Sequence, residues 1–358
     1  MTNRIVGIDV ARALAIMGMI IVNFKIAFGD KGNEVYKLFA SIFEGKAAAT
    51  FVVLAGIGIA FMSNNAVKNN DKIKLNNTRI KIAKRAIFLF VIGLLYTPIW
   101  IADILHFYGI YMLITLLLIA SSRKLIFNLG LSLILVYPLL MLLWNYDTGW
   151  NFETFVYSDL WSVSGFFRNL FYNGFHPVIP WTAFMFLGLW FGKQDLSNEK
   201  FIKKSILVSI SVFIIMLFIS KGLIAVLSEG NQATLLELKQ VLGTSPMPPL
   251  PIYMISGSSI AVFIISMSIL IAKKYETNFI IVALTKTGQL ALTFYVAHVI
   301  IGMGIVEFIN PEKMGKYSIE FSIIYALVFS VFCVLFAVIW TKYKKTGPLE
   351  WVMRKIAK

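Results

Sequence analysis

Long apolar runs alternate with short polar segments along the whole chain. Ten such runs lie at residues 8–28, 47–63, 86–102, 104–121, 125–144, 179–192, 205–227, 252–272, 288–307 and 319–341. A helix needs roughly 20 apolar residues to cross ~30 Å of hydrocarbon, and in hydrocarbon the backbone must satisfy its own hydrogen bonds. The pattern therefore predicts an all-α, polytopic membrane protein of about ten transmembrane helices, which form a single domain over residues 1–358.

The polar segments between the runs alternate in charge. Basic residues fill every second loop and the tail 342–358, whereas the loops 145–178 and 228–251 carry most of their charge as acidic residues. Basic loops stay on the cytoplasmic side of a membrane. We therefore expect both termini in the cytoplasm, the aromatic loop 145–178 outside, and the amphipathic stretch 276–287 at the inner surface. Within the outer loop, WNYDTGW and FFRNLFYNGFHP are typical of interfacial half-helices.

Composition supports the membrane class and excludes others. Of the 358 residues 58% are hydrophobic and only 14% are charged, whereas soluble domains carry about 25% charged residues. The net charge of +15 lies in the short loops and is explained by topology, so we expect no nucleic-acid partner. The single cysteine, Cys333, lies in an apolar run and allows no disulfide within the chain. Three histidines on three separate segments do not predict a metal site.

Several charged or polar residues lie within or at the edge of the apolar runs, where such residues are functional by default. Asp9 and Arg12 are three positions apart and so share one face of the first helix near its cytoplasmic start. They form either an ion pair within the helix or an anion-facing site at the inner mouth. Asn23, near the outer end of that helix, is either a helix–helix hydrogen-bond partner or a site residue. Glu44, at the outer start of the second run, is either a helix cap or a catalytic carboxylate.

The three histidines suggest different roles. Asp103 and His106 lie three positions apart at the outer turn between the third and fourth runs. A carboxylate that orients an imidazole makes a general base for an alcohol or amine, and the alternative is a solvated loop pair. His176 precedes two prolines at the outer end of the sixth run, where it either contacts substrate or decorates the loop. His298 lies deep in the ninth run, either hydrogen-bonded to a neighbouring helix or in contact with substrate.

Several segments together resemble a known family. The segments are RIVGIDVARALAIMGMIIVNF, FEGKAAATFVVLAGIGIAF, ADILHFYGIYMLI, GQLALTFYVAHVIIG and VIWTKYKKTGPLEWVMRKI. They are similar to motifs of the YeiB-like membrane acyltransferases and extend from residue 4 to residue 356. The stretch HPVIPWTAFMFLGLWFGK also resembles relatives of heparan-alpha-glucosaminide N-acetyltransferase.

The resemblance implies transfer of an acyl group from cytoplasmic acyl-CoA, first of all acetyl-CoA, to the hydroxyl or amine of a sugar-like acceptor outside. It also implies a multi-pass protein of the plasma membrane and is compatible with a homodimer. The chain departs from the family pattern in three places: Ala13 replaces a glycine, Phe294 replaces an asparagine, and no histidine lies near Ala40. The base must then be sought elsewhere. The candidates are His106, Glu44 and His298.

These residues support one catalytic scheme and one rival. The expected donor-binding residues at the inner mouth are Asp9, Arg12, Arg85 and Lys286. The expected acceptor-binding residues are Trp181 and His176. In the scheme His106, oriented by Asp103, takes the acceptor proton, and Asn23 or His298 donates to the developing oxyanion. The rival is a transporter or flippase for a small polar or anionic solute, in which the embedded polar groups line a route and no covalent chemistry takes place.

Overall fold

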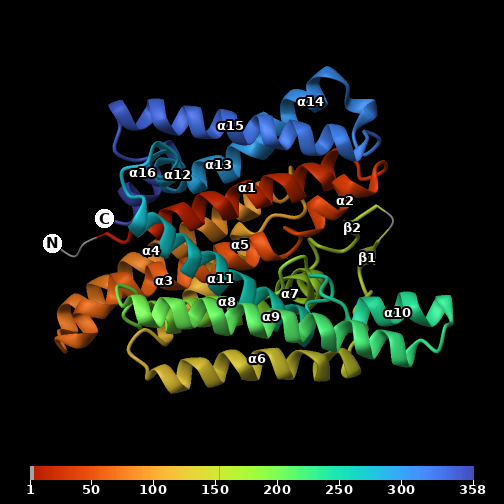
Figure 1. Cartoon of the computed structure of the whole chain (residues 1–358), viewed down its shortest axis with the longest axis horizontal. Coiled ribbons are helices and arrows are strands. Elements are labelled where there is room, and N and C mark those ends of the chain that lie inside the picture. The colour runs from red at the N-terminus through yellow and green to blue at the C-terminus, as the bar shows by residue number, and fades with distance from the viewer. Residues whose placement is uncertain (1–3, 153) are drawn as a thin grey trace. The chain divides into compact units, whose positions relative to one another are not determined.

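A computed structural model describes residues 4–152 and 154–358 of the protein (Figure 1). The α-helices are α1 (Val6–Phe28), α2 (Glu34–Ser41), α3 (Lys46–Lys68), α4 (Lys72–Tyr96), α5 (Leu105–Leu117), α6 (Arg123–Leu143), α7 (Val163–Arg168), α8 (Val178–Gly192), α9 (Glu199–Leu227), α10 (Gln232–Leu242), α11 (Pro251–Lys274), α12 (Phe279–Gln289), α13 (Ala291–Ala297), α14 (Gly304–Ile309), α15 (Ile319–Tyr343) and α16 (Pro348–Ile356). The other elements are the strands β1 (Trp150–Asn151) and β2 (Val156–Tyr157), the π-helical turns η1 (Asn169–Asn173) and η2 (His298–Met303), and the 3-10 turn η3 (Pro311–Lys313).

All ten apolar runs are helical over most of their length, so the all-α polytopic class is confirmed. By length and composition, seven helical segments in the described part of the chain are able to cross a membrane. They are Val6–Phe28, Glu34–Lys68, Arg123–Leu143, Glu199–Leu227, Pro251–Lys274, Ala291–Ile309 and Ile319–Tyr343. Two further runs form the shorter apolar helices α5 and α8. The third run lies largely in α4, which begins 14 residues earlier in the basic loop. The total of ten spans and the side on which each terminus lies remain predictions.

Short polar side chains explain where several helices begin. Asn33, Asp71, Ser122, Asn278 and Ser318 precede α2, α4, α6, α12 and α15, and each accepts a hydrogen bond from a backbone N–H of the first turn. Such caps satisfy donors that have no partner within the helix. Apolar composition therefore selects the helices, and these residues fix the points at which they begin.

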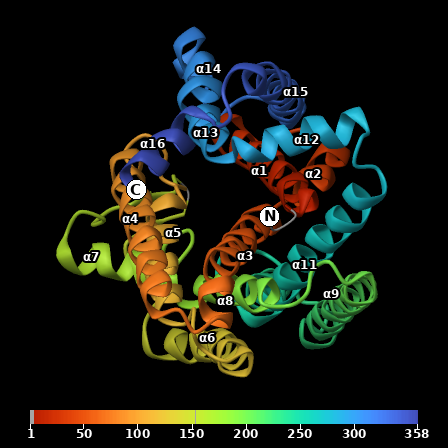
Figure 2. The same cartoon turned by 90° about the vertical axis from the view of Figure 1, so that its left-hand side faces the viewer.

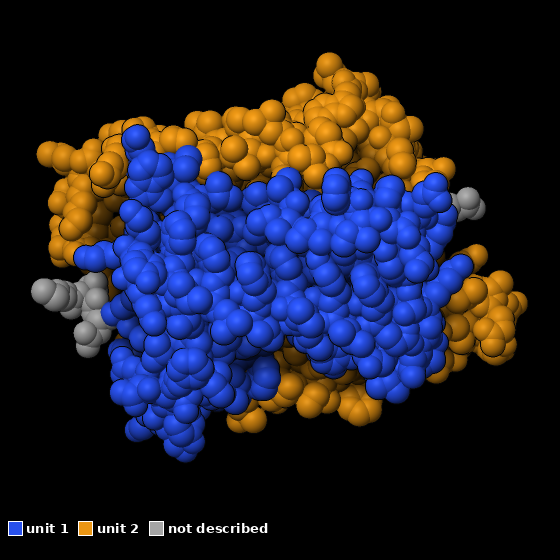
Figure 3. All heavy atoms as spheres, turned by 90° about the horizontal axis from the view of Figure 1, so that it is seen from above, with its two compact units in different colours: residues 1–51, 197–206, 261–355 blue, residues 52–196, 207–260, 356–358 orange. Residues whose placement is uncertain are grey.

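The chain divides into two compact units (Figure 3). Unit 1 comprises Met1–Phe51, Ser197–Ile206 and Ala261–Lys355, and unit 2 comprises Val52–Leu196, Leu207–Ile260 and Ile356–Lys358. Helices α3, α9, α11 and α16 contribute residues to both units. The assignment of residues 1–358 to one transmembrane domain remains a prediction.

Unit 1 is built around α1, which packs against α12, α13 and α15 (Figure 2). The contact with α12 depends on Gly288, because a Cβ there would lie 1.8 Å from the carbonyl oxygen of Asp9. Near its C-terminal end α1 buries Phe24 and Phe28 against Tyr325 of α15, with ring centroids 5.3 and 5.6 Å apart. A small residue allows close backbone approach, and aromatic rings fill the remaining space.

Unit 2 contains the helix pairs α4–α5, α6–α8 and α5–α8. Glycine again permits close contacts. A Cβ at Gly109 of α5 would lie 2.6 Å from the Ala86 carbonyl oxygen, and one at Gly188 of α8 would lie 2.0 Å from the Val53 carbonyl oxygen. The loop from α6 to α8 is attached to these helices by buried aromatic residues, among them Tyr172 and Tyr137, whose hydroxyl donates to the Tyr172 carbonyl at 2.8 Å.

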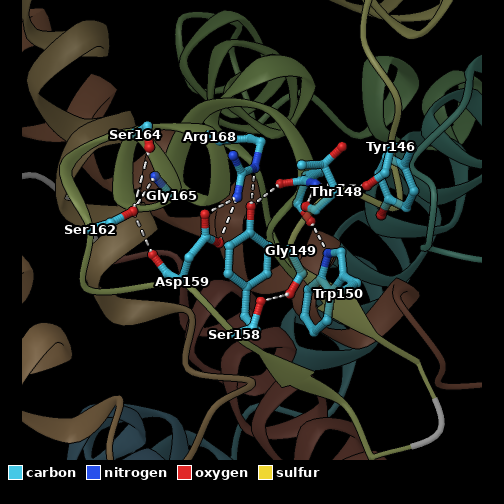
Figure 4. Close-up of polar contacts among 12 residues, drawn as sticks. Tyr146, Thr148, Gly149, Trp150, Ser158, Asp159, Ser162, Ser164, Gly165 and Arg168 are labelled. Carbon is cyan, nitrogen blue, oxygen red and sulfur yellow. Dashed lines mark hydrogen bonds and ion pairs between the residues drawn. The ribbon is translucent and has the colours of Figure 1, made fainter.

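The loop 145–178 has a defined fold of its own (Figure 4). The prediction of a half-helix was wrong for WNYDTGW, because Trp150 begins β1, which pairs with β2 as a short hairpin. The FFRNLFYN part of the second stretch is helical over α7 and η1. The side-chain amide of Asn173 donates to the Tyr146 and Thr148 carbonyls at 2.6 and 2.8 Å, and its oxygen accepts from the Tyr157 hydroxyl at 2.7 Å. Buried polar side chains, not helical periodicity, therefore determine this loop.

Candidate functional site

A carboxylate–imidazole pair lies at the junction of α4 and α5 in unit 2. The Nδ1 atom of His106 is 2.9 Å from Oδ2 of Asp103, and the backbone N–H of His106 donates to the same oxygen at 3.2 Å. Asp103 is fully buried and His106 is 4% exposed, so the alternative of a solvated loop pair is wrong. Because the carboxylate binds Nδ1, it favours the tautomer with a proton there and a lone pair on Nε2. This geometry suits a general base.

Gly93 and Thr97 of α4 lie against this pair. A Cβ at position 93 would lie 2.2 Å from the His106 backbone nitrogen and 2.8 Å from Oδ2 of Asp103. The Thr97 hydroxyl donates to the Gly93 carbonyl at 2.9 Å and lies 3.5 Å from Nδ1 of His106. The end of α4 therefore fixes both the backbone and the ring of the pair.

A second histidine lies near the pair. The ring of His176 is 6.0 Å from that of Phe107 and 4.6 Å, edge to face, from that of Trp181. The Tyr111 hydroxyl donates to the His176 carbonyl and fixes the backbone before α8. Burial, followed by the nearby His106, lowers the pKa of His176 to about 3. His176 is therefore neutral at physiological pH and can both donate and accept a hydrogen bond.

Two nitrogens at this place have unused hydrogen-bonding capacity. His176 Nδ1 and Trp181 Nε1 are buried and have no hydrogen-bond partner among the described residues. Buried polar atoms are almost always paired in folded proteins, and those that are not require an explanation such as a ligand. The two predicted acceptor-binding residues thus lie side by side, and each has a ring nitrogen without a hydrogen-bond partner.

Unit 1 contains a cluster of charges at the start of α1. The carboxylate of Asp9 accepts from Nη1 of Arg12 at 2.6 Å and from Nε of Arg4 at 2.7 Å. Asp9 is buried, whereas the side chains of Arg12 and Arg4 are 29% and 61% exposed. The ion pair within the helix is therefore present. Two guanidinium groups on one carboxylate also leave one positive charge in excess, which suits an anion.

The other predicted donor-binding residues lie apart in the sequence. Lys286 belongs to α12 of unit 1, the helix that packs against α1. Arg85 belongs to α4 of unit 2, and its Nη1 contacts the sulfur of Met62 at 3.3 Å. Their part in binding a donor remains a prediction.

A buried histidine of unit 1, His298, is paired with an asparagine. Nδ2 of Asn23 is 2.9 Å from Nε2 of His298, which is fully buried and begins the π-helical turn η2. The predicted helix–helix hydrogen bond is thus confirmed, with Asn23 and His298 as partners. Single π turns within α-helices occur often at functional sites.

Glu44 is already engaged by a cation. Its Oε1 accepts from Nζ of Lys25 at 2.6 Å, and the two side chains are 33% and 20% exposed. Glu44 therefore serves unit 1 as a salt-bridge partner between α1 and the turn before α3. Of the three base candidates, His106 has the arrangement that activates a nucleophile, because a buried carboxylate orients its ring.

The structure groups the predicted residues into pairs: Asp103 with His106, His176 with Trp181, Asn23 with His298, and Asp9 with Arg12. Sequence reasoning missed Arg4, Lys25, Gly93 and Thr97. Arg4 was recognisable as a cation five positions before Asp9. No group of three or more His, Cys, Asp or Glu side chains that could hold a metal ion occurs in residues 4–152 and 154–358.

The fold and these pairs define an all-α polytopic membrane protein with buried acid–base groups. Residues 4–226 match the family described as heparan-alpha-glucosaminide N-acetyltransferase, catalytic, and the chain belongs to that family. Residues 190–358 match a second family, described as protein of unknown function (DUF418), which confirms the YeiB-like resemblance. No curated protein matches the chain.

Proposed function

We propose that the protein is a membrane acyltransferase that uses acyl-CoA, with acetyl-CoA as the first donor to test. The acceptor is the hydroxyl or amine of a sugar-like molecule on the outer side, and the membrane is the plasma membrane. The match of residues 4–226 to a catalytic family supports chemistry over transport by a flippase. The observation that carries the proposal further is the buried Asp103–His106 pair.

The pair supplies the acid–base steps of the transfer. His106 takes the acceptor proton on Nε2 as the acceptor oxygen or nitrogen attacks the thioester carbonyl. A C–O or C–N bond forms, the C–S bond breaks, and the imidazolium returns its proton to the leaving CoA sulfur. Asp103 holds the ring and stabilises the imidazolium between the two steps.

The acceptor contacts proposed in unit 2 are His176 and Trp181. Trp181 Nε1 is a donor, and a neutral His176 offers one donor and one acceptor. An acceptor rich in hydroxyl groups would satisfy both nitrogens that lack partners. The edge-to-face arrangement of the two rings also holds their polar atoms in fixed directions.

The donor contacts proposed in unit 1 are cationic at one end of α1 and polar at the other. Arg4, Arg12 and Lys286 would bind phosphates of the nucleotide in unit 1. Arg85, in unit 2, is a separate candidate for a donor contact. Asn23 has a second amide hydrogen beyond the one directed at His298 and could donate it to the oxyanion. One such donor typically stabilises a transition state by ~3 kcal/mol.

Turnover of acetyl-CoA by the purified protein in detergent tests the proposal. Release of free CoA is measured with a thiol reagent, first with water and then with amino sugars as acceptors. His106→Gln should lower the rate by about 10²–10⁴-fold, the usual share of a general base. The matched control is Glu237→Gln, an exposed residue of α10, which should keep the wild-type rate. Full activity of the His106 variant would overturn the assignment, and absence of any acyl-CoA binding would overturn the function.

A further inference from the structure

The C-terminal segment is joined to a helix of unit 1 by one buried carboxylate. Oε1 of Glu350 accepts from the backbone N–H groups of Leu292 and Thr293 at 2.8 and 3.1 Å. Its Oε2 accepts from the Thr293 hydroxyl at 2.5 Å, and that hydroxyl in turn accepts from the Leu349 backbone at 3.2 Å. Glu350 is only 8% exposed, although Trp351 and Arg354 in the same helix are exposed.

The surrounding chain is shaped for this contact. A Cβ at Gly347 would lie 2.1 Å from Oε2 of Glu350 and 2.8 Å from the Thr293 hydroxyl, so a larger residue there would displace the carboxylate from this contact. The indole of Trp340 donates to the Thr346 carbonyl at 3.0 Å and holds the turn between α15 and α16. The residues that form the contact thus account for most of the GPLEW motif.

The contact lies where a helix is interrupted. α12 ends at Gln289, and α13 begins again at Ala291 with no cap from its own preceding residue. The first N–H groups of a new helix have no partner within it, and a carboxylate there also interacts favourably with the helix dipole. Glu350, which is 57 and 58 positions away, therefore supplies the cap that the local sequence lacks.

The same helix carries His298. Thr293 is five residues before His298, which follows α13 directly and reaches Asn23 of α1. A helix that is held at its first turn has a fixed rotation, and a rotation error at that turn would be carried to the next one. We propose that Glu350 is a positioning residue that keeps His298 in contact with Asn23. Its effect on catalysis rests on the function proposed for that pair.

Two measurements separate this inference from the proposed function. The first is the rate at which diethylpyrocarbonate modifies His298, monitored by mass spectrometry. This measurement requires no enzyme activity. His298 is fully buried in the wild type, so its modification should be slow. The second measurement is kcat and KM for acetyl-CoA, in case turnover is observed.

Glu350→Ala removes all three hydrogen bonds, whereas Glu350→Gln keeps an oxygen for the two backbone N–H groups. In the alanine variant the reagent should modify His298 about tenfold faster than in the wild type. Its kcat should fall by about 10–100-fold with little change in KM, since small misplacements of a catalytic group lower the rate by this much. The glutamine variant should recover most of both values. Glu307→Ala, an exposed carboxylate of α14, is the matched control and should behave as wild type.

The inference would be overturned if Glu350→Ala had the same rate of His298 modification and the same kcat as the wild type. If the alanine variant does not fold, the glutamine variant decides the case. It keeps an acceptor for the two backbone N–H groups but loses the charge, so His298 should be modified faster than in the wild type by less than tenfold, and a rate equal to that of the wild type would overturn the inference. Slow modification in the wild type, fast modification in the alanine variant, and no turnover by either would support the positioning role while rejecting the proposed function.

Discussion

Replacement of Asp103 by asparagine tests the central pair most directly. Asparagine keeps the size of the side chain and an oxygen for the His106 backbone N–H, but it removes the negative charge that holds Nδ1 at 2.9 Å. A hydrogen bond to a charged group contributes about 1.5–3 kcal/mol. At 1.36 kcal/mol per tenfold in rate, its loss should lower kcat by about 10–150-fold. If the amide NH₂ turns toward Nδ1, the ring proton moves to Nε2 and the loss is larger.

A double-mutant cycle determines whether Asp103 acts through His106. CoA release is measured for the wild type, Asp103→Asn, His106→Gln and the double variant at saturating acetyl-CoA. If the carboxylate serves only to orient and charge the ring, the double variant should be as slow as His106→Gln. Losses that multiply would show that Asp103 acts independently. A rate within twofold of wild type for Asp103→Asn would refute the role of the pair.

Three further predictions follow from single contacts. Gly93→Ala places a Cβ 2.2 Å from the His106 backbone nitrogen, so it should destabilise the protein by about 1–3 kcal/mol and lower activity, whereas Gly222→Ala, with open space around it, should do neither. Below pH ~6.5 His176 gains a proton in the unfolded state, whereas in the folded state it stays neutral down to about pH 3 because its pKa is lowered. The melting temperature of the wild type should therefore fall relative to His176→Gln as the pH drops from 6.5 to 4. Arg12→Gln should raise KM for acetyl-CoA but not for an acetyl thioester without a nucleotide, and an equal rise for both donors would place the anion site elsewhere.

Hydropathy predicted the helices because each of the ten runs was long, apolar and bounded by charged or polar residues. The amphipathic stretch 276–287 and the run 288–307 were already distinct in the sequence, and in the structure α12 ends at Gln289 and α13 begins at Ala291. The pattern could not show which group caps the second of these helices. Glu350, 58 positions from Leu292, accepts from the first turn of that helix, and a window along the sequence does not include that contact. The hairpin of β1 and β2 was missed for the same reason, as it depends on Asn173 and not on a local period.

In the candidate site, too, contacts between residues close in the sequence could be predicted, and contacts between distant residues could not. Pairs three positions apart on one helical turn, such as Asp103 with His106, were predicted because the helical period alone brings them together. Asn23 and His298 are 275 positions apart, and their contact depends on how α1 packs against α13 and η2. Sequence reasoning therefore identified both residues as costly polar groups without showing that they satisfy each other.

The ring nitrogen that each partner occupies assigns different roles to the two buried histidines. Asp103 is an acceptor and takes the Nδ1 side of His106, so Nε2 keeps its lone pair and can receive a proton. Asn23 presents its amide nitrogen, a donor, to Nε2 of His298, and this favours the tautomer with the lone pair on Nε2 and the proton on Nδ1. A ring whose basic nitrogen already accepts a hydrogen bond is a poor proton acceptor, but it orients the second N–H of its partner. The hydrogen bonds within unit 2 therefore suit His106 as a proton acceptor, and those within unit 1 suit Asn23, held by His298, as a hydrogen-bond donor.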